Sequence, residues 1–309
     1  MIHPIPSGTR DVLPDEMREL RAITEKLRGV FEDHGYGEIS TPAIEYEGVL
    51  RRGGDGVSPA YRVFDDHGDV LALRSDMTVP IARVAATRYA GVTPPLRFSS
   101  FAHVYRGVRP HRGQMREYLQ AGCELIGSPA PDGTVEVLTV LCRALDATGL
   151  RDYRIGLGDA SIYPSLMEAV GVDDQRRHVL LDHLVGRNFV GLEHDAEDLD
   201  PLLVDVPQRR GGPEVLDGLP GAEGLRQVHS GLEADVAARV ILDLGLVRDL
   251  DYYTGAVFEV YDASIGRPIG GGGRYDELMG RLGRPMPAVG FAVGVDVLHE
   301  ALAAEERDA

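Results

Sequence analysis

The 309-residue sequence has few cysteines and an excess of acidic over basic residues. Its two cysteines, Cys123 and Cys142, both stand in apolar surroundings (AGCELIG and VLTVLCRAL). Such surroundings favour buried free thiols, and we expect no disulfide. The 32 lysines and arginines are outnumbered by 49 aspartates and glutamates, which gives a formal net charge of −17. This balance disfavours nucleic acid as a partner, because its phosphates repel an acidic surface.

The sequence also lacks the signatures of several common sites. It has no HExxH or CxxC pattern, so we expect no metal site. It has no GxSxG elbow, and the glycine run 270–273 stands in neither a GxGxxG nor a GK[ST] pattern. No apolar run approaches the roughly 20 residues of a membrane helix, and no leader peptide is recognisable. We therefore predict a cytoplasmic protein with no cofactor and no membrane partner.

Helical and extended patterns alternate along the chain. The composition, with 43% hydrophobic and 26% charged residues, is typical of a globular protein. A helix is predicted over 15–34 by apolar residues at helical spacing, namely Met17, Leu20, Ile23, Leu27 and Phe31. A hairpin is predicted around 66–68, followed by a helix with Pro80 in its first turn. Two long apolar runs, RFSSFAHVYR and REYLQAGCELIG, predict neighbouring antiparallel strands.

The segment 173–233 differs from the rest of the chain. It consists of acidic, arginine-rich helical stretches that are interrupted by QRRGGPEV and DGLPGAEG. We interpret it as a small helical insertion, which leaves 1–172 and 234–309 as one core domain. Strands are predicted to resume at 239–244 and at 253–261. This order predicts an α/β fold of the α+β type, in which helices flank a central, mostly antiparallel sheet.

Three residues of the run REYLQAGCELIG are candidates for a binding site. Because residues two apart on a strand share a face, Gln120, Gly122 and Glu124 would present an amide, a gap and a carboxylate on one surface. An amide and a carboxylate can hold an ammonium group or an imidazole nitrogen. The alternative is a solvated strand face with a bulge at Gly122.

Polar residues at two other places could complete such a site. Asp76 and Thr78 stand just before a predicted helix, and the alternative role is capping of that helix, which contributes about 1 kcal/mol. Arg106 ends the run RFSSFAHVYR, and its guanidinium can bind a carboxylate or a phosphate with two hydrogen bonds. The alternative for Arg106 is a surface ion pair.

Two tracts near the C-terminus add further candidates, DLGLVRDLDYYTGAVFEVYD and IGGGGRYDELMGRLGRPMPAVGFAVGVDVL. Arg248 could serve a site or pair with Asp251. We favour Tyr253 over Tyr252, since neighbours in an extended segment point to opposite faces. Tyr275 follows the glycine run, and its alternative role is that of a core tyrosine. Together with the groups above, these side chains suit a free amino acid with a polar ring.

These tracts resemble the paired histidine-specific motifs of histidyl-tRNA synthetase. The segments PSGTRDVLPDE, TPAIEY, LALRSDMT and VYRGVRPHRGQMREYLQAGCELIG are similar to the catalytic core of that class II synthetase. The resemblance implies a class II synthetase-like fold. It also implies histidine binding by Asp76, Thr78, Arg106, Gln120, Glu124, Arg248, Tyr253 and Tyr275. Asp76 stands where the enzymes usually carry glutamate.

The sequence departs from the synthetases where they bind ATP. Val108 replaces the glutamate of the second class II motif, and Val297 replaces the arginine of the third. The loss of one charged donor typically lowers a rate about a hundred- to a thousandfold. Asp249 replaces a glycine of the enzymes. Eleven residues follow Leu298, so we expect no C-terminal anticodon-binding domain.

The pattern as a whole resembles the family of ATP phosphoribosyltransferase regulatory subunits. The resemblance implies a non-catalytic subunit that a short catalytic subunit needs for activity in the first step of histidine biosynthesis. It also implies feedback inhibition by L-histidine, a hetero-oligomer and self-association as a dimer. Two alternatives remain. One is a truncated enzyme that activates histidine for an acceptor other than tRNA, and the other is a dimeric scaffold with a vestigial pocket.

Overall fold

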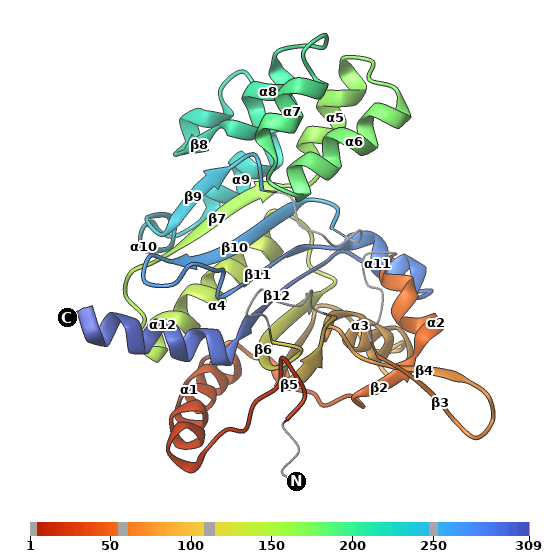
Figure 1. The fold of residues 1–309 in the computed structure, drawn as a ribbon, viewed down its shortest axis with the longest axis vertical. Coiled ribbons are helices and arrows are strands. Elements are labelled where there is room, and N and C mark those ends of the chain that lie inside the picture. The colour runs from red at the N-terminus through yellow and green to blue at the C-terminus, as the bar shows by residue number, and fades with distance from the viewer. Residues whose placement is uncertain (1–4, 55–60, 108–114, 247–252, 309) are drawn as a thin grey trace.

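The structure is a computed structural model that describes residues 5–54, 61–107, 115–246 and 253–308. Within these residues, a nine-stranded sheet has the order β1-β5-β6-β12-β11-β10-β7-β9-β8 (Figure 1). Its strands are β1 (Gly37–Glu38), β5 (Leu96–Tyr105), β6 (Glu117–Ile126), β7 (Tyr153–Asp159), β8 (Arg210–Gly211), β9 (Val240–Asp243), β10 (Ala256–Asp262), β11 (Gly270–Arg274) and β12 (Ala288–Gly294). The pairs β1–β5 and β7–β9 are parallel, and the other neighbours in this order are antiparallel. The predictions of a mostly antiparallel sheet and of adjacent antiparallel strands at β5 and β6 are confirmed.

A smaller antiparallel sheet has the order β2-β4-β3, with strands β2 (Ile44–Tyr46), β3 (Arg62–Phe64) and β4 (Val70–Leu73). Strands β3 and β4 form the predicted hairpin, and Gly68 in its turn has a φ of 88°. That backbone conformation is open to glycine at little cost.

The helices lie on both sides of the central sheet. They are α1 (Pro14–Asp33), α2 (Glu47–Leu50), α3 (Thr78–Thr87), α4 (Asp132–Thr148), α5 (Ile162–Ala169), α6 (Asp174–Val185), α7 (Phe189–Asp195), α8 (Leu202–Asp205), α9 (Glu223–Gly231), α10 (Ala234–Ala237), α11 (Asp276–Arg281) and α12 (Val295–Asp308). Short 3₁₀ turns add η1 (Arg51–Gly53), η3 (Val206–Gln208) and η4 (Pro213–Leu216). In the described parts of the chain we find no helix with the length and apolarity needed to span a membrane.

Helices α1 and α4 cover one face of the sheet and form the main core with it. The apolar positions that predicted α1 are buried there, among them Leu27 and Phe31, which are fully enclosed. Each such side chain contributes about 1.5–3 kcal/mol when it leaves water. Cys123 of β6 and Cys142 of α4 lie in the same core as buried free thiols, which confirms that prediction. Helices α3 and α11 form a second, smaller core with part of the opposite face, where Ile81 and Leu278 are buried.

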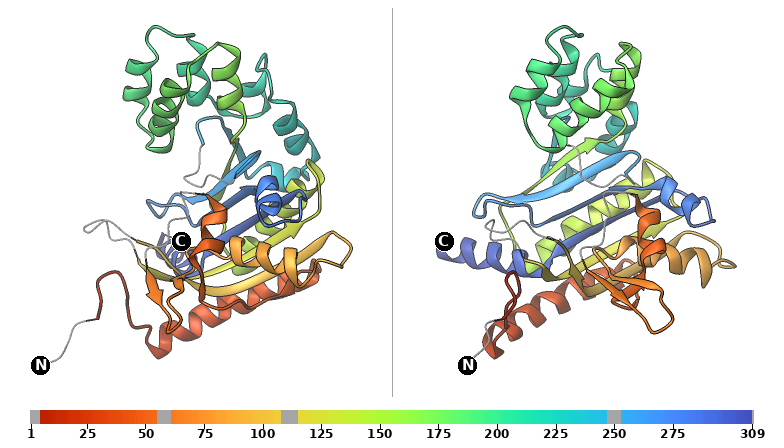
Figure 2. Two further views of the ribbon diagram at one scale, coloured as in Figure 1. Left: turned by 90° about the vertical axis from the view of Figure 1, so that its right-hand side faces the viewer. Right: turned by 45° about the vertical axis from the view of Figure 1, so that its right-hand side comes forward.

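Helices α5 to α8 gather into a separate group, which we call the helical lobe (residues 162–208). In both views of Figure 2 the lobe stands at the end of the molecule opposite α1. Tyr163 of α5 donates a hydrogen bond of 3.0 Å to the carbonyl of Leu203 in α8, so α5 is part of the lobe although it precedes residue 173. Helix α9 packs instead on α4, where a Cβ at Gly231 would lie 3.0 Å from Val135. The boundaries 173–233 of the insertion stay a prediction.

The glycine run 270–273 forms β11, which lies very close to its neighbour β12. A Cβ at Gly272 would overlap the carbonyl oxygen of Gly290 and would lie 2.7 Å from Cα of Phe291. Both atoms belong to the backbone and have little room to move. The run is therefore required by the close approach of two strands.

We expect Gly272→Ala to lower the free energy of unfolding by about 2–3 kcal/mol, because the added methyl group pushes two central strands apart. Chemical denaturation measures this change. The matched control is Gly29→Ala in α1, where a Cβ meets no atom within 4 Å. That change should raise the free energy of unfolding by about 0.5–1 kcal/mol. Equal effects of the two substitutions would contradict this account of β11.

Candidate ligand-binding site

A cavity of about 570 Å³ lies over strands β6, β12 and β11, on the face of the sheet opposite α1 and α4. The floor consists of small residues on these strands, namely Gly122, Gly270, Gly271, Gly272, Gly290, Ala292 and Gly294. The strand register places them side by side, since Gly122 pairs with Ala292, and Ala292 pairs with Gly271. With almost no side chains on the floor, a ligand can lie directly against the sheet.

The cavity is lined by all of the predicted site residues that the structure describes. They are Asp76, Thr78, Arg106, Gln120, Glu124, Tyr253 and Tyr275. Arg248 lies outside the described residues, as do Val108 and Asp249. Binding of histidine by this set stays a prediction, but the residues do come together around one space from five separate parts of the chain.

The carboxylate of Glu124 is almost completely enclosed in the cavity wall, with 5% of the residue exposed. Its Oε1 accepts a hydrogen bond of 2.7 Å from the Thr78 hydroxyl, and its Oε2 accepts one from the Tyr275 hydroxyl. Gly290 leaves the space for it, because a Cβ there would overlap Oε2. Burial raises the pKa of Glu124 to about 7; the two hydrogen bonds oppose this rise, and the nearby Asp76 adds to it. With a pKa near 7, the carboxyl group can lose its proton when a cation binds beside it.

The alternative of a solvated, bulged strand face at Gly122 is wrong. Gln120 and Glu124 are 7% and 5% exposed, and the pairing of β6 with both neighbours runs without interruption through Gly122. In the described structure the carbonyl oxygen Oε1 of Gln120 is buried and accepts no hydrogen bond. A buried acceptor without a donor costs about 1–3 kcal/mol, so a donor from a ligand would relieve this site.

Asp76 and Arg106 both line the cavity, and Asp76 lies just before α3. Oδ1 of Asp76 accepts a hydrogen bond of 3.3 Å from the amide of Val79, so the capping role considered for this residue is present together with a place in the cavity wall. Burial raises the pKa of Asp76, and the Arg106 cation lowers it in part. Arg106 itself donates to the carbonyl of Ser75 at 3.0 Å, and its guanidinium lies 5.6 Å from the ring centre of Tyr118.

Tyr253 and Tyr275 form the side of the cavity near β11. Tyr275 is 1% exposed and donates to Glu124, so it is a core tyrosine and a cavity residue at once. The predicted strand 253–261 begins later than expected, at Ala256, because the chain bends at Gly255. Tyr253 precedes that bend, and its ring covers Gly273, where a Cβ would lie 2.8 Å from two ring carbons.

The outer part of the cavity contains charged residues that sequence reasoning missed. Arg10 from the N-terminal segment pairs with Glu16 and with Asp296 of α12, and Arg267 pairs with Glu300. Arg10 and Asp296 are 286 positions apart, and Arg267 and Glu300 are 33 apart, so no local pattern could have linked these two pairs. Val297 lies among these pairs on α12 and is half-buried. In the part of the chain that the structure describes, no cluster of three or more His, Cys, Asp or Glu residues could hold a metal ion.

The site and the sheet can now be compared with known proteins. The family model of histidyl-tRNA synthetase matches residues 8–298. The chain belongs to the histidyl-tRNA synthetase family. A solved structure from Bacillus halodurans, described as an ATP phosphoribosyltransferase regulatory subunit/histidyl-tRNA synthetase, aligns with a TM-score of 0.89 and 31% identity. It covers 98% of this chain and 84% of that chain, and the predicted class II synthetase-like fold is thereby confirmed.

Within this family, curated relatives carry two kinds of name. The ATP phosphoribosyltransferase regulatory subunits of Desulforamulus reducens and Symbiobacterium thermophilum are 40% and 41% identical to this chain, over 94% and 95% of its length and 76% and 78% of theirs. The histidine–tRNA ligase of Methanocaldococcus jannaschii is 36% identical, over 94% of this chain and 74% of its own. The predicted resemblance to the regulatory subunits is confirmed, and the enzymes of the family are relatives as well.

The raised pKa of Glu124 makes the stability of the protein depend on pH. The folded-state pKa of about 7 exceeds the ordinary value of 4.5, so the folded state binds the proton more tightly. The free energy of unfolding should therefore fall as pH rises from about 4.5 to about 7, by up to about 3 kcal/mol. Glu124→Gln, which cannot ionise, should be more stable than the parent at pH 8 and equal to it at pH 4.5. Denaturation midpoints of the variant and the parent at both pH values test this. If the midpoints of the two proteins differ by the same amount at pH 4.5 and at pH 8, the prediction is wrong.

Proposed function

We propose that this chain is the regulatory subunit of ATP phosphoribosyltransferase, that it senses L-histidine in the cavity on its central sheet, and that it works with a short catalytic subunit. Feedback inhibition by histidine in the first step of histidine biosynthesis would then start from this cavity. The proposal gains support from the names of the curated relatives at 40–41% identity and from the chemistry of the cavity.

The observation that carries the proposal is the buried pair of acceptors on β6. Glu124 offers a carboxylate that is already oriented by Thr78 and Tyr275, and Gln120 offers a carbonyl oxygen that lacks a donor in the described structure. A free amino acid brings the ammonium and ring nitrogen that such acceptors require. Its carboxylate suits the guanidinium of Arg106 at the mouth. Hydrogen bonds to charged groups each contribute about 1.5–3 kcal/mol when water is excluded.

The outer cavity supports a regulatory role rather than an activating one. Its arginines are already paired with carboxylates, since Arg10 binds Glu16 and Asp296 while Arg267 binds Glu300. The apolar Val297 stands beside these pairs. A triphosphate would have to break the pairs before it could use their guanidinium groups. This arrangement disfavours the stabilisation of negative charge that activation with ATP needs.

An enzyme that activates histidine for an acceptor other than tRNA is the second candidate. The observation in its favour is the 36% identity to the Methanocaldococcus jannaschii histidine–tRNA ligase. Both candidates would bind histidine, but only the second must also bind ATP and react it with histidine. A test of ATP-dependent activation therefore distinguishes them, whereas a test of histidine binding does not.

Isothermal calorimetry should detect binding of L-histidine to the purified chain. Gln120→Ala and Glu124→Gln should each weaken binding about tenfold or more, because each loses a hydrogen bond to a charged group. Near pH 7 the ammonium of the ligand should lower the pKa of Glu124, so binding should release a proton that the buffer takes up. Enthalpies in buffers of different ionisation heat report that proton.

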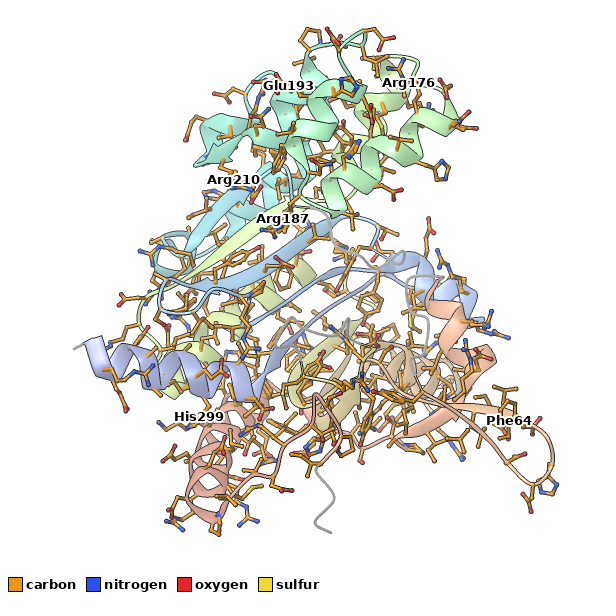
Figure 3. All side chains as sticks on the ribbon, in the orientation of Figure 1. Phe64, Arg176, Arg187, Glu193, Arg210 and His299 are labelled. Atoms are coloured by element: carbon orange, nitrogen blue, oxygen red, sulfur yellow. The ribbon has the colours of Figure 1, made fainter. Side chains whose placement is uncertain are left out.

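Glu193→Gln, in an exposed position on α7 far from the cavity, is the matched control for these variants and should bind as the parent does (Figure 3). Absence of any binding heat in the parent would indicate a vestigial pocket and would reject histidine sensing.

A purified short catalytic subunit should co-elute with the chain in size-exclusion chromatography. Its phosphoribosyl transfer should rise on mixing and should then become sensitive to L-histidine. The chain alone should support no histidine-dependent exchange between ATP and pyrophosphate. Robust exchange would favour the histidine-activating enzyme, and separate elution of the two proteins at working concentrations would count against the regulatory assignment.

A further inference from the structure

Arg187 ends helix α6 in a backbone conformation that usually belongs to glycine. It is the one non-glycine residue with positive φ, at 52°, among the residues that the structure describes. Its amide bonds to the carbonyl of Leu184 at 3.0 Å, and the next amide, of Asn188, bonds to the carbonyl of His183 at 2.8 Å. This pair of hydrogen bonds is the Schellman motif, in which glycine is preferred at the left-handed position. An arginine there costs about 1–2 kcal/mol of backbone strain, which calls for a function of its side chain.

The side chain of Arg187 reaches out of the helical lobe to the central sheet (Figure 3). One terminal nitrogen donates to the Tyr261 hydroxyl at 2.7 Å and to Oε2 of Glu259 at 3.0 Å. The Tyr261 hydroxyl in turn donates to the same carboxylate. We call this set of contacts between Arg187, Glu259 and Tyr261 the clasp. It joins the lobe to strand β10 through one cation and one carboxylate.

The clasp ends at the wall of the ligand cavity. Glu259 and Tyr261 are two residues apart on β10 and share the sheet face that carries Glu124. Glu259 itself lines the cavity. Its partners across both neighbouring strands are Gly156 and Gly271, and the ring of Tyr261 lies beside Gly156, where a Cβ would be 3.4 Å from a ring carbon. Glu259 therefore takes part in the clasp and borders the cavity at the same time.

The turn that bears Arg187 is firmly tied to the lobe. His183 bonds to Asp195 of α7 at 2.7 Å and to the Asn188 side chain at 3.2 Å, which fixes the connection between α6 and α7. The base of the lobe also packs on the core, since a Cβ at Gly245 would lie 3.4 Å from the ring of Phe189. A shift of the lobe on this apolar base would move Arg187 with it.

We propose that Arg187 is a positioning residue that couples the helical lobe to the ligand cavity through Glu259. A ligand that favours the clasped position of Glu259 restrains the lobe, and a lobe held in the clasped position binds that ligand more tightly; the two effects are equal by linkage. The identity of the ligand as L-histidine rests on the function proposed above. The coupling itself rests on the clasp.

Arg187→Gly is the decisive variant, because glycine relieves the strained backbone while the clasp is lost. We expect its thermal midpoint to stay at or above that of the parent. Spin labels at Arg21→Cys on α1 and Glu193→Cys on α7 would report the lobe position by double electron–electron resonance in the full chain, whose native cysteines are buried. The distance distribution should be broader in Arg187→Gly than in the parent. The dissociation constant for L-histidine should rise about fivefold or more.

Two further variants complete the test. Arg187→Lys, which keeps the charge, should restore part of the affinity and part of the narrow distribution. Arg176→Ala removes a half-buried arginine that pairs with Asp198 inside the lobe, and it should behave as the parent (Figure 3). Equal distributions and equal affinities in parent and Arg187→Gly would overturn the proposal.

The outcome separates this inference from the proposed function. If the parent does not bind L-histidine in calorimetry, the histidine-sensing function is rejected. The spin-label distance distributions measured without ligand still show whether the clasp holds the lobe in position. Broadening in Arg187→Gly then supports the clasp, and an unchanged distribution overturns it.

Discussion

The site depends on one buried carboxylate that several distant segments hold in place. Glu124 stands on β6, Thr78 begins α3, Tyr275 follows β11, and Gly290 of β12 leaves the room that the carboxylate fills. Burial alone would favour the neutral acid, and the two hydroxyl donors oppose that preference. The opposing effects place the pKa near neutrality. A ligand cation can therefore decide the charge of the group, and the fold has to bring all four segments together before this balance exists.

The two faces of the central sheet divide the tasks of stability and recognition. On β6, Cys123 and Leu125 point to α1 and α4 and belong to the core, whereas Gln120 and Glu124 point to the cavity. The strands β11 and β12 can carry glycine on the cavity side because the helices on the other face supply the packing. On the cavity side, the carboxylate of Glu124 fills the space that a side chain at Gly290 would occupy. The cavity floor can therefore consist of small residues, because the packed side chains on the face toward α1 and α4 hold the strands in place.

Local patterns were enough to predict most of the fold and part of the site. Helix α1, the hairpin β3–β4 and the alternation along β6 follow from periodicities that tertiary contacts reinforce. The grouping of the cavity residues came from resemblance to a family, and the register of β6, β12 and β11 supplies its physical reason. The pair of Arg10 and Asp296 could not be predicted, since 286 positions separate the two residues. The start of β10 was also misplaced, because a bend at Gly255 interrupts a run of strand-forming residues.

Arg187 adopts the left-handed conformation in which glycine is preferred, and its side chain also links the helical lobe to the central sheet. The sequence places Gly186 one residue before the left-handed position of the α6 terminus and leaves Arg187 to adopt it. Exchanging their order would satisfy the helix terminus but would move the guanidinium to another point on the turn. From this strained conformation Arg187 reaches Glu259 and Tyr261 on the central sheet. Under the proposed coupling, the strained backbone at Arg187 holds the clasp between the lobe and the cavity, and a ligand contact at Glu259 biases both.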